Sequence, residues 1–167
     1  MKDKHKSMYM RVAEAVALTS PAVRLKVGAV AVKGNMIIGT GYNALPAGLD
    51  GECEDRVYPS HPFLPVKEND EYPYLCDRHV LPTGRKAKYK RVTKFEVRHA
   101  ESNLLLNLAK STESSVGATI FCTHACCKFC AMDIVDSGIK SVYYRHDYRD
   151  SSGISYLRDN GVTLEQI

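Results

Sequence analysis

Two short stretches decide how the fold of this chain is to be interpreted: residues 99–101 are His-Ala-Glu, and residues 127–130 are Cys-Lys-Phe-Cys. A zinc ion that activates a water molecule needs three protein ligands and one open coordination position. His99, Cys127 and Cys130 supply three ligands of suitable type, and Glu101 remains free to move protons. The two stretches predict a catalytic zinc site, and the rest of the chain is the scaffold that joins them.

Length and composition indicate a single domain. The chain has 167 residues, 44% of them hydrophobic, and its net charge of +4 suits an anionic ligand without requiring nucleic acid. No apolar stretch follows the basic residues 1–10, and no segment reaches the ~18 apolar residues of a membrane span. Four of the six cysteines lie between residues 122 and 130. We therefore expect metal binding in the reducing cytoplasm, with no disulfides and no membrane segment.

Hydrophobic periodicity predicts strands and helices that alternate around the two motifs. A hairpin is expected from strands at 27–32 and 36–41, because Gly34-Asn35 between them is a typical tight turn. The other expected elements are helices over 7–18, 97–110, 127–137 and 152–160, and strands over 118–123, 140–145 and 162–165. This order predicts an α/β fold with a sheet of about five strands flanked by helices.

An insertion at about 49–95 interrupts this pattern within the domain 1–167. Six prolines between residues 44 and 95 make a long regular helix or strand improbable there. We expect an irregular segment, with short helices left open. A loop of this length in a compact domain is often functional.

The spacing of the two motifs fits hydrolytic deamination. Ligands at i and i+3 of a helical turn share one face, and helix N-termini favour thiolates. Glu101 can take a proton from water, pass it to a ring nitrogen and protonate the departing amine. Two alternatives remain. A structural zinc site would need a fourth ligand such as Cys122, Cys126 or His124, and a redox Cys-x-x-Cys pair would leave His-Ala-Glu unexplained.

With these motifs the chain resembles the cytidine/deoxycytidylate deaminase superfamily. Residues 24–30, Arg-Leu-Lys-Val-Gly-Ala-Val, and residues 41–48, Gly-Tyr-Asn-Ala-Leu-Pro-Ala-Gly, extend the resemblance, and the second block is similar to the deoxycytidylate branch. The resemblance implies a three-layer fold with a mixed sheet and zinc-dependent conversion of dCMP to dUMP for thymidylate synthesis. Cys126 stands where the superfamily usually has proline. Cys127 is chosen as the ligand because only it preserves the Cys-x-x-Cys-Ala order.

The resemblance also implies three substrate contacts. Asn43 would meet the sugar, at its 3′-hydroxyl, Arg24 would bind the 5′-phosphate, and Tyr148 would line the pocket. Each has a simpler interpretation that stays open: Asn43 as a turn residue, Arg24 as a solvated charge and Tyr148 as a packing residue.

Regulation is a further implication of the resemblance. Deoxycytidylate deaminases are typically homohexamers that dCTP, accompanied by Mg²⁺, activates and dTTP inhibits. The effector site would lie near a subunit interface at the loop Ala44, Leu45, Pro46, Ala47 and Gly48. An ordinary tight turn is the alternative for this loop.

The insertion carries two more candidate features. Cys53, Cys76 and His79, with His61 nearby, are candidates for a second zinc site, against unpaired thiols and surface histidines. The basic stretch 85–98 is interpreted first as a solvated face, then as a phosphate site, and last as a nucleic-acid site.

Two rival functions stay open. One is deamination of a base within tRNA or single-stranded DNA, which needs an open groove for the base. The other is a non-catalytic, zinc-stabilised binding module, for which Glu101 would have no purpose.

Overall fold

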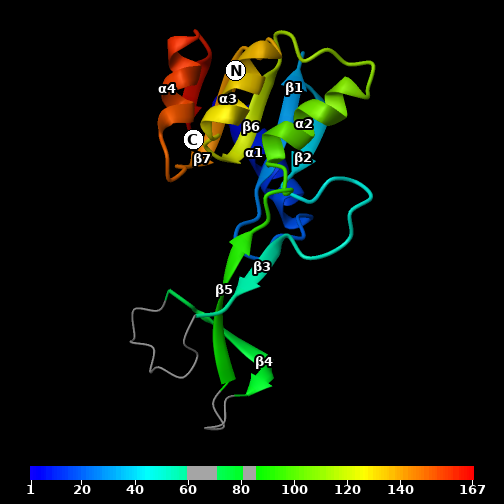
Figure 1. Ribbon diagram of the computed structural model, residues 1–167. Coiled ribbons are helices and arrows are strands. Elements are labelled where there is room, and N and C mark those ends of the chain that lie inside the picture. Colours follow the sequence, from blue (N-terminus) through cyan, green and yellow to red (C-terminus); the bar gives the residue numbers. More distant parts are fainter. Residues whose placement is uncertain (60–70, 81–85) are drawn as a thin grey trace.

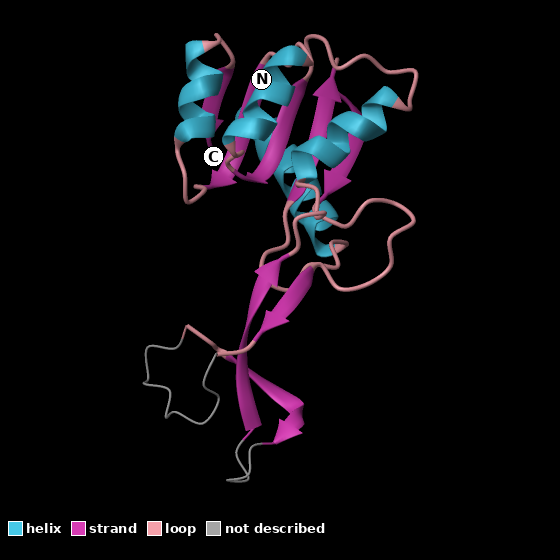
Figure 2. Cartoon of the chain, in the orientation of Figure 1, coloured by secondary structure: helices cyan, strands magenta, loops and turns pink. Residues whose placement is uncertain are grey.

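A computed structural model describes residues 1–59, 71–80 and 86–167, with the side chains of 77–80 and 86 left undescribed. Figure 1 labels the elements along the chain, and Figure 2 separates helices from strands. In chain order they are α1 (Asp3–Leu18), β1 (Gly28–Lys33), β2 (Met36–Tyr42), β3 (Glu54–Val57), β4 (Tyr74–Val80), β5 (Lys86–Thr93), α2 (Ala100–Ala109), β6 (Thr119–His124), α3 (Lys128–Asp136), β7 (Ser141–His146), α4 (Ser152–Asp159) and β8 (Thr163–Gln166).

The main sheet has five strands in the order β2-β1-β6-β7-β8. Strand β1 runs antiparallel to β2 and β6, whereas β6, β7 and β8 are parallel to one another. The expected mixed sheet of about five strands is therefore confirmed. The hairpin is confirmed too, since Gly34 and Asn35 have φ angles of 55° and 67°, as a tight turn of this kind requires.

The sheet lies between helices on both faces, which confirms the three-layer fold. Side chains alternate along a strand, so each strand serves two cores. On β1, Val30 and Val32 pack against α1, while Ala29 and Ala31 belong to the cluster formed with α2, α3 and α4. None of the helices in the described ranges is long and apolar enough to cross a membrane.

A glycine allows α2 to approach the sheet closely. A Cβ atom on Gly41 would lie only 2.4 Å from the carbonyl oxygen of Ala100 and from the backbone nitrogen of Leu104. The first turn of α2 therefore rests on β2 backbone to backbone. This contact fixes the height of His99 and Glu101 above the edge of the sheet.

The insertion forms an extended arm, which we define as β3, β4 and β5, in the order β3-β5-β4. It projects away from the layered core (Figure 1). The expectation of an irregular segment is wrong here. Pro59 and Pro73 lie just outside the strands, and β5 forms antiparallel pairs with both neighbours. Pro59 and Pro73 thus flank the strands instead of interrupting them.

Ion pairs and aromatic contacts occupy most of the basic residues of the arm that the structure describes. Arg91 lies 3.1 Å from Glu52, and Lys94 lies 3.9 Å from Asp55. The Arg91 guanidinium also lies 5.8 Å from the centre of the Tyr89 ring. These contacts favour the interpretation of residues 85–98 as a solvated, self-paired face.

Candidate active site

Two helix N-termini bring the predicted metal ligands together. His99 is the N-cap residue of α2, and Cys127 is the N-cap residue of α3, with Cys130 one turn further on. The Nδ1 atom of His99 lies 3.4 Å from the Sγ atoms of both cysteines. Among the described residues these three form the one group able to hold a metal ion, with ligand atoms within 4.8 Å of each other.

The distances fit a zinc ion. Zinc–nitrogen bonds of about 2.0 Å and zinc–sulfur bonds of about 2.3 Å at a tetrahedral angle separate nitrogen from sulfur by about 3.5 Å. The observed 3.4 Å agrees. Contacts with Cys130 and His99 hold the pKa of Cys127 well below its usual value, so a thiolate is available. Cys126 is buried in the core cluster instead, and burial raises its pKa.

Glu101 is a buried carboxyl beside this group. Its side chain is 4% exposed, and burial raises its pKa from 4.5 to about 7, against the lowering effects of its own backbone amide and of His99. The Cys122 thiol, itself fully buried, contributes a hydrogen bond to it. A carboxyl with a pKa near neutrality can both accept and release a proton during a reaction.

The candidate metal ligands His99 and Cys127 line a cavity of about 670 Å³, which is within the usual range for small-molecule sites. His99, Glu101 and Cys127 line one part of it, and residues from the loop before β1, from the arm and from the loop after β7 complete the wall. Arg24, Asn43 and Tyr148, the three substrate contacts expected from the resemblance, all lie in this wall.

The Asn43 amide is largely committed to the protein itself. Its Oδ1 accepts hydrogen bonds from the Val27 backbone N–H and the Ser20 hydroxyl, each at 2.8 Å, and its Nδ2 donates to the Leu25 carbonyl at 2.8 Å. Asn43 thus holds the loop before β1 in place. One Nδ2 hydrogen remains for a ligand.

The side chains of Arg24 and Tyr148 are less tied to the rest of the protein than the Asn43 amide is. The Arg24 Nη1 donates a hydrogen bond to the Thr93 hydroxyl at 3.1 Å, so the arm orients this guanidinium. The guanidinium of Arg149 lies 5.5 Å from the centre of the Tyr148 ring. Both residues lie where cavity and solvent meet.

The sequence did not single out Glu54 and Arg149, which also line the cavity, and it named His124 only as a possible fourth ligand of a structural zinc site. The Thr123 hydroxyl accepts the Gly28 N–H and lies 3.1 Å from Nδ1 of His124. Burial and the neighbouring His146 lower the pKa of His124. The position of His124 three residues before the first zinc cysteine was the available signal.

The effector loop and the second zinc site remain predictions. Residues 44–48 lie outside the cavity wall as far as the described residues define it, and Ala44 forms a β-bridge with Arg98. Cys53 packs with Ala22 and Val97, whereas Cys76 belongs to a separate cluster in the arm. His61 and the side chain of His79 lie outside the described residues.

Three protein ligands leave a coordination position for water, and a buried carboxyl stands beside them. This arrangement matches the metal centre of the zinc-dependent nucleobase deaminases, where one glutamate serves as proton shuttle without binding the metal. The class follows from the site itself.

Comparisons with known proteins narrow the class. The model of the cytidine and deoxycytidylate deaminase zinc-binding region matches residues 3–146. Deoxycytidylate deaminase of Enterobacteria phage T4 is 31% identical over 95% of this chain and 87% of its own length. The human deoxycytidylate deaminase is 31% identical over 90% of this chain and 70% of its own length. The chain belongs to the cytidine and deoxycytidylate deaminase family.

Solved structures agree with this assignment. The dCMP deaminase of cyanophage S-TIM5, in complex with dCMP and dUMP, superposes with a TM-score of 0.76 at 34% identity, over 100% of this chain and 99% of that one. A tRNA:A34 deaminase structure, 16% identical with a TM-score of 0.52, shares the fold alone.

Proposed function

We propose that this enzyme hydrolyses dCMP to dUMP and ammonia. The observation that carries the proposal is the three-ligand group beside buried Glu101, in a chain similar over its whole length to an enzyme solved with dCMP and dUMP. In the reaction water adds its oxygen to C4 of the pyrimidine, and the C4 amino group leaves as ammonia. No oxidant or reductant is needed.

His99, Cys127 and Cys130 would hold the zinc ion. Zinc bound there supplies a water activated at neutral pH. The two helix N-termini that carry these ligands stabilise the negative charge of the thiolates. Each ligand sits on or beside a packed helix, so the group is held rigid before substrate binds.

Glu101 carries the protons. It accepts one proton from the attacking water and delivers it to N3 of the ring. It then takes the second proton from the new C4 hydroxyl and passes it to the amine, as the C4–N bond breaks and the C4 carbonyl forms. Its burial excludes bulk water, so the proton stays between Glu101 and the substrate. Substrate orientation comes from the opposite wall, where Arg24 would bind the 5′-phosphate and Tyr148 the nucleotide face.

Ammonia release from dCMP by the zinc-loaded protein tests the proposal, with CMP and deoxycytidine as comparison substrates. We expect turnover selective for dCMP. Glu101→Gln should abolish turnover and retain zinc. Absence of dCMP turnover in the zinc-loaded protein, with turnover of RNA or single-stranded DNA instead, would refute the proposal.

The proposal extends to regulation. dCTP with Mg²⁺ would activate a homohexamer and dTTP would inhibit it, with residues 44–48 contacting the effector; the product would feed thymidylate synthesis in the cytoplasm. Gly48 has a φ of 91° in a turn closed by the Leu49 N–H and the Pro46 carbonyl at 3.0 Å, and its lack of a side chain would let an effector phosphate approach this backbone. Sedimentation with and without Mg-dCTP, beside the ammonia assay, should show a hexamer and stimulated turnover.

A further inference from the structure

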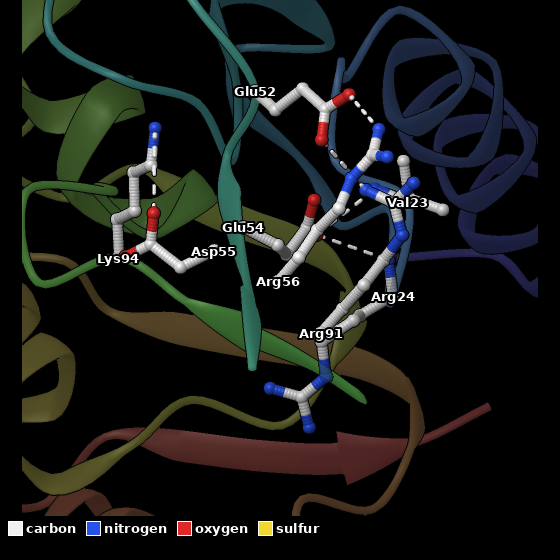
Figure 3. Close-up of polar contacts among 8 residues, drawn as sticks. All are labelled: Val23, Arg24, Glu52, Glu54, Asp55, Arg56, Arg91 and Lys94. Carbon is white, nitrogen blue, oxygen red and sulfur yellow. Dashed lines mark hydrogen bonds and ion pairs between the residues drawn. The ribbon is translucent and has the colours of Figure 1, made fainter. Parts of the chain in front are cut away.

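Glu54 is a buried carboxylate in the wall of the cavity. It is the first residue of β3, it is 3% exposed, and it lies opposite Thr93 of β5 at the root of the arm. Its Oε1 accepts hydrogen bonds from the backbone N–H groups of Val23 at 2.9 Å and Arg24 at 3.0 Å (Figure 3). One oxygen therefore holds the loop that carries Arg24.

The other carboxylate oxygen of Glu54 makes no such contact. Oε2 is buried and has no hydrogen-bond partner among the described residues, and Glu54 forms no ion pair with any of them. A buried, unsatisfied carboxylate oxygen is costly, because the desolvated group receives nothing in return. A substrate donor that reached this oxygen would remove that cost.

The chemistry of a deoxynucleotide limits which donor this can be. The hydrogen-bond donors of fully ionised dCMP are the C4 amino group and the 3′-hydroxyl. The amino group must lie at the end of the cavity with His99 and Glu101, where the reaction occurs. The 3′-hydroxyl is left for the part of the lining where Glu54 neighbours Arg24, the candidate for the 5′-phosphate.

We propose that Oε2 of Glu54 binds the 3′-hydroxyl of the deoxyribose and thereby selects free mononucleotides. The inference rests on the proposed function, since it assumes that dCMP is the substrate. It supplements the predicted contact of Asn43, whose amide is mostly used to brace its own loop. An esterified 3′-oxygen cannot donate, and its phosphate would meet the carboxylate charge. Nucleotides within DNA or RNA are rejected on both grounds.

A substrate series measures the contact. The wild-type enzyme is assayed with dCMP, with 2′,3′-dideoxycytidine 5′-monophosphate and with deoxycytidine 3′,5′-bisphosphate. A hydrogen bond to a carboxylate predicts that removal of the hydroxyl lowers kcat/KM by about 10- to 100-fold. The bisphosphate should be a still poorer substrate.

Glu54→Gln tests the residue itself. The Gln oxygen can keep the two backbone contacts, while its NH₂ group cannot accept a hydrogen bond from the hydroxyl. We expect the preference for dCMP over the dideoxy substrate to fall to within about 3-fold, and the bisphosphate to be rejected less. Glu52→Gln is the matched control: Glu52 pairs with Arg56 and Arg91 outside the cavity and should leave both preferences unchanged.

A structural role alone would lower turnover of all three substrates equally, and that result overturns the inference. If Glu54→Gln fails to fold, a crystal structure of the wild type with dUMP decides. Oε2 should lie about 2.7 Å from the 3′-oxygen, and a separation beyond about 4 Å overturns the inference. Absence of dCMP turnover in the wild type would refute the proposed function instead, so the two failures are distinguishable.

Discussion

Substitution of Gly153 by alanine should weaken zinc binding, although Gly153 is not itself a metal ligand. Gly153 lies in the first turn of α4, against the loop that leads into α3. A Cβ atom there would lie 2.2 Å from the Cys126 carbonyl oxygen and 2.8 Å from the Cys127 carbonyl carbon. A carbon normally approaches a carbonyl oxygen to about 3.3 Å. Gly153→Ala therefore requires a retreat of about 1 Å by the loop, by α4, or by both.

The size of the effect follows from this displacement. Overpacking of this kind costs about 1–3 kcal/mol of stability. Metal sites tolerate ligand displacements of only about 0.2 Å, and disturbed ligand supports typically cost about 10- to 100-fold in affinity. Because any retreat of the loop moves the backbone of Cys127, we expect Gly153→Ala to weaken zinc binding by that factor. Competition with a chromophoric chelator, at a temperature where circular dichroism shows full folding, measures it.

Gly39→Ala is the matched control. Its Cβ would lie 2.8 Å from the Cδ2 atom of Leu108, the end of a flexible side chain far along α2 from His99. It should cost stability and leave the zinc affinity of the wild type unchanged. Equal zinc affinity in the two variants would refute the reasoning, because it would mean that α4 alone gives way.

Three other predictions use the same protein. In the chelated, metal-free enzyme, the raised pKa of Glu101 stabilises the fold fully below pH 4.5, and this stabilisation is lost as the pH rises through about 7. The loss in the free energy of unfolding is at most about 3 kcal/mol. Urea denaturation at pH 5 and pH 8 should show this loss for the wild type and not for Glu101→Gln. Cys126→Ala should retain one zinc at a cost of about 1–2 kcal/mol, whereas Cys127→Ala should lose it, and metal analysis showing the reverse would move the ligand to Cys126. Arg24→Gln should lower kcat/KM for dCMP by about 10-fold or more and leave deoxycytidine unchanged, while an equal loss for both would contradict phosphate binding.

The parts of the fold that follow local patterns were predictable. The hairpin depends on a two-residue turn, and the metal group depends on spacing within one helical turn plus a histidine at a helix start. The turn and the Cys127–Cys130 pair are set by residues close in sequence, whereas His99 joins the pair only because α2 packs against α3. The structure accordingly places His99, Cys127 and Cys130 together where their spacing indicated.

The arm was not predictable because its strands are made by distant partners. Glu54 pairs with Thr93 across a long segment. Strand β3 has only four residues, and the alternation of Ala87 and Tyr89 with lysines in β5 does not show which strand is its partner. Glu54 itself stands in the acidic stretch Gly-Glu-Cys-Glu-Asp, residues 51–55, which has the composition of an exposed turn. Only the pairing of β3 with β5 buries this carboxylate, so its candidate role could not be inferred from local sequence.

The root of the arm therefore lines the candidate active site. Glu54 holds the backbone at Arg24, and Thr93 holds its guanidinium, from two strands that pair with each other. Ser20 and Asn43 brace the same loop from its other side. The cavity lining around Arg24 thus depends on strand pairing in the arm, whereas the metal ligands depend on two helix starts and on the packing of α2 against α3. In the proposed function, the helices that carry His99, Cys127 and Cys130 would perform the chemistry, and the root of the arm would select the nucleotide.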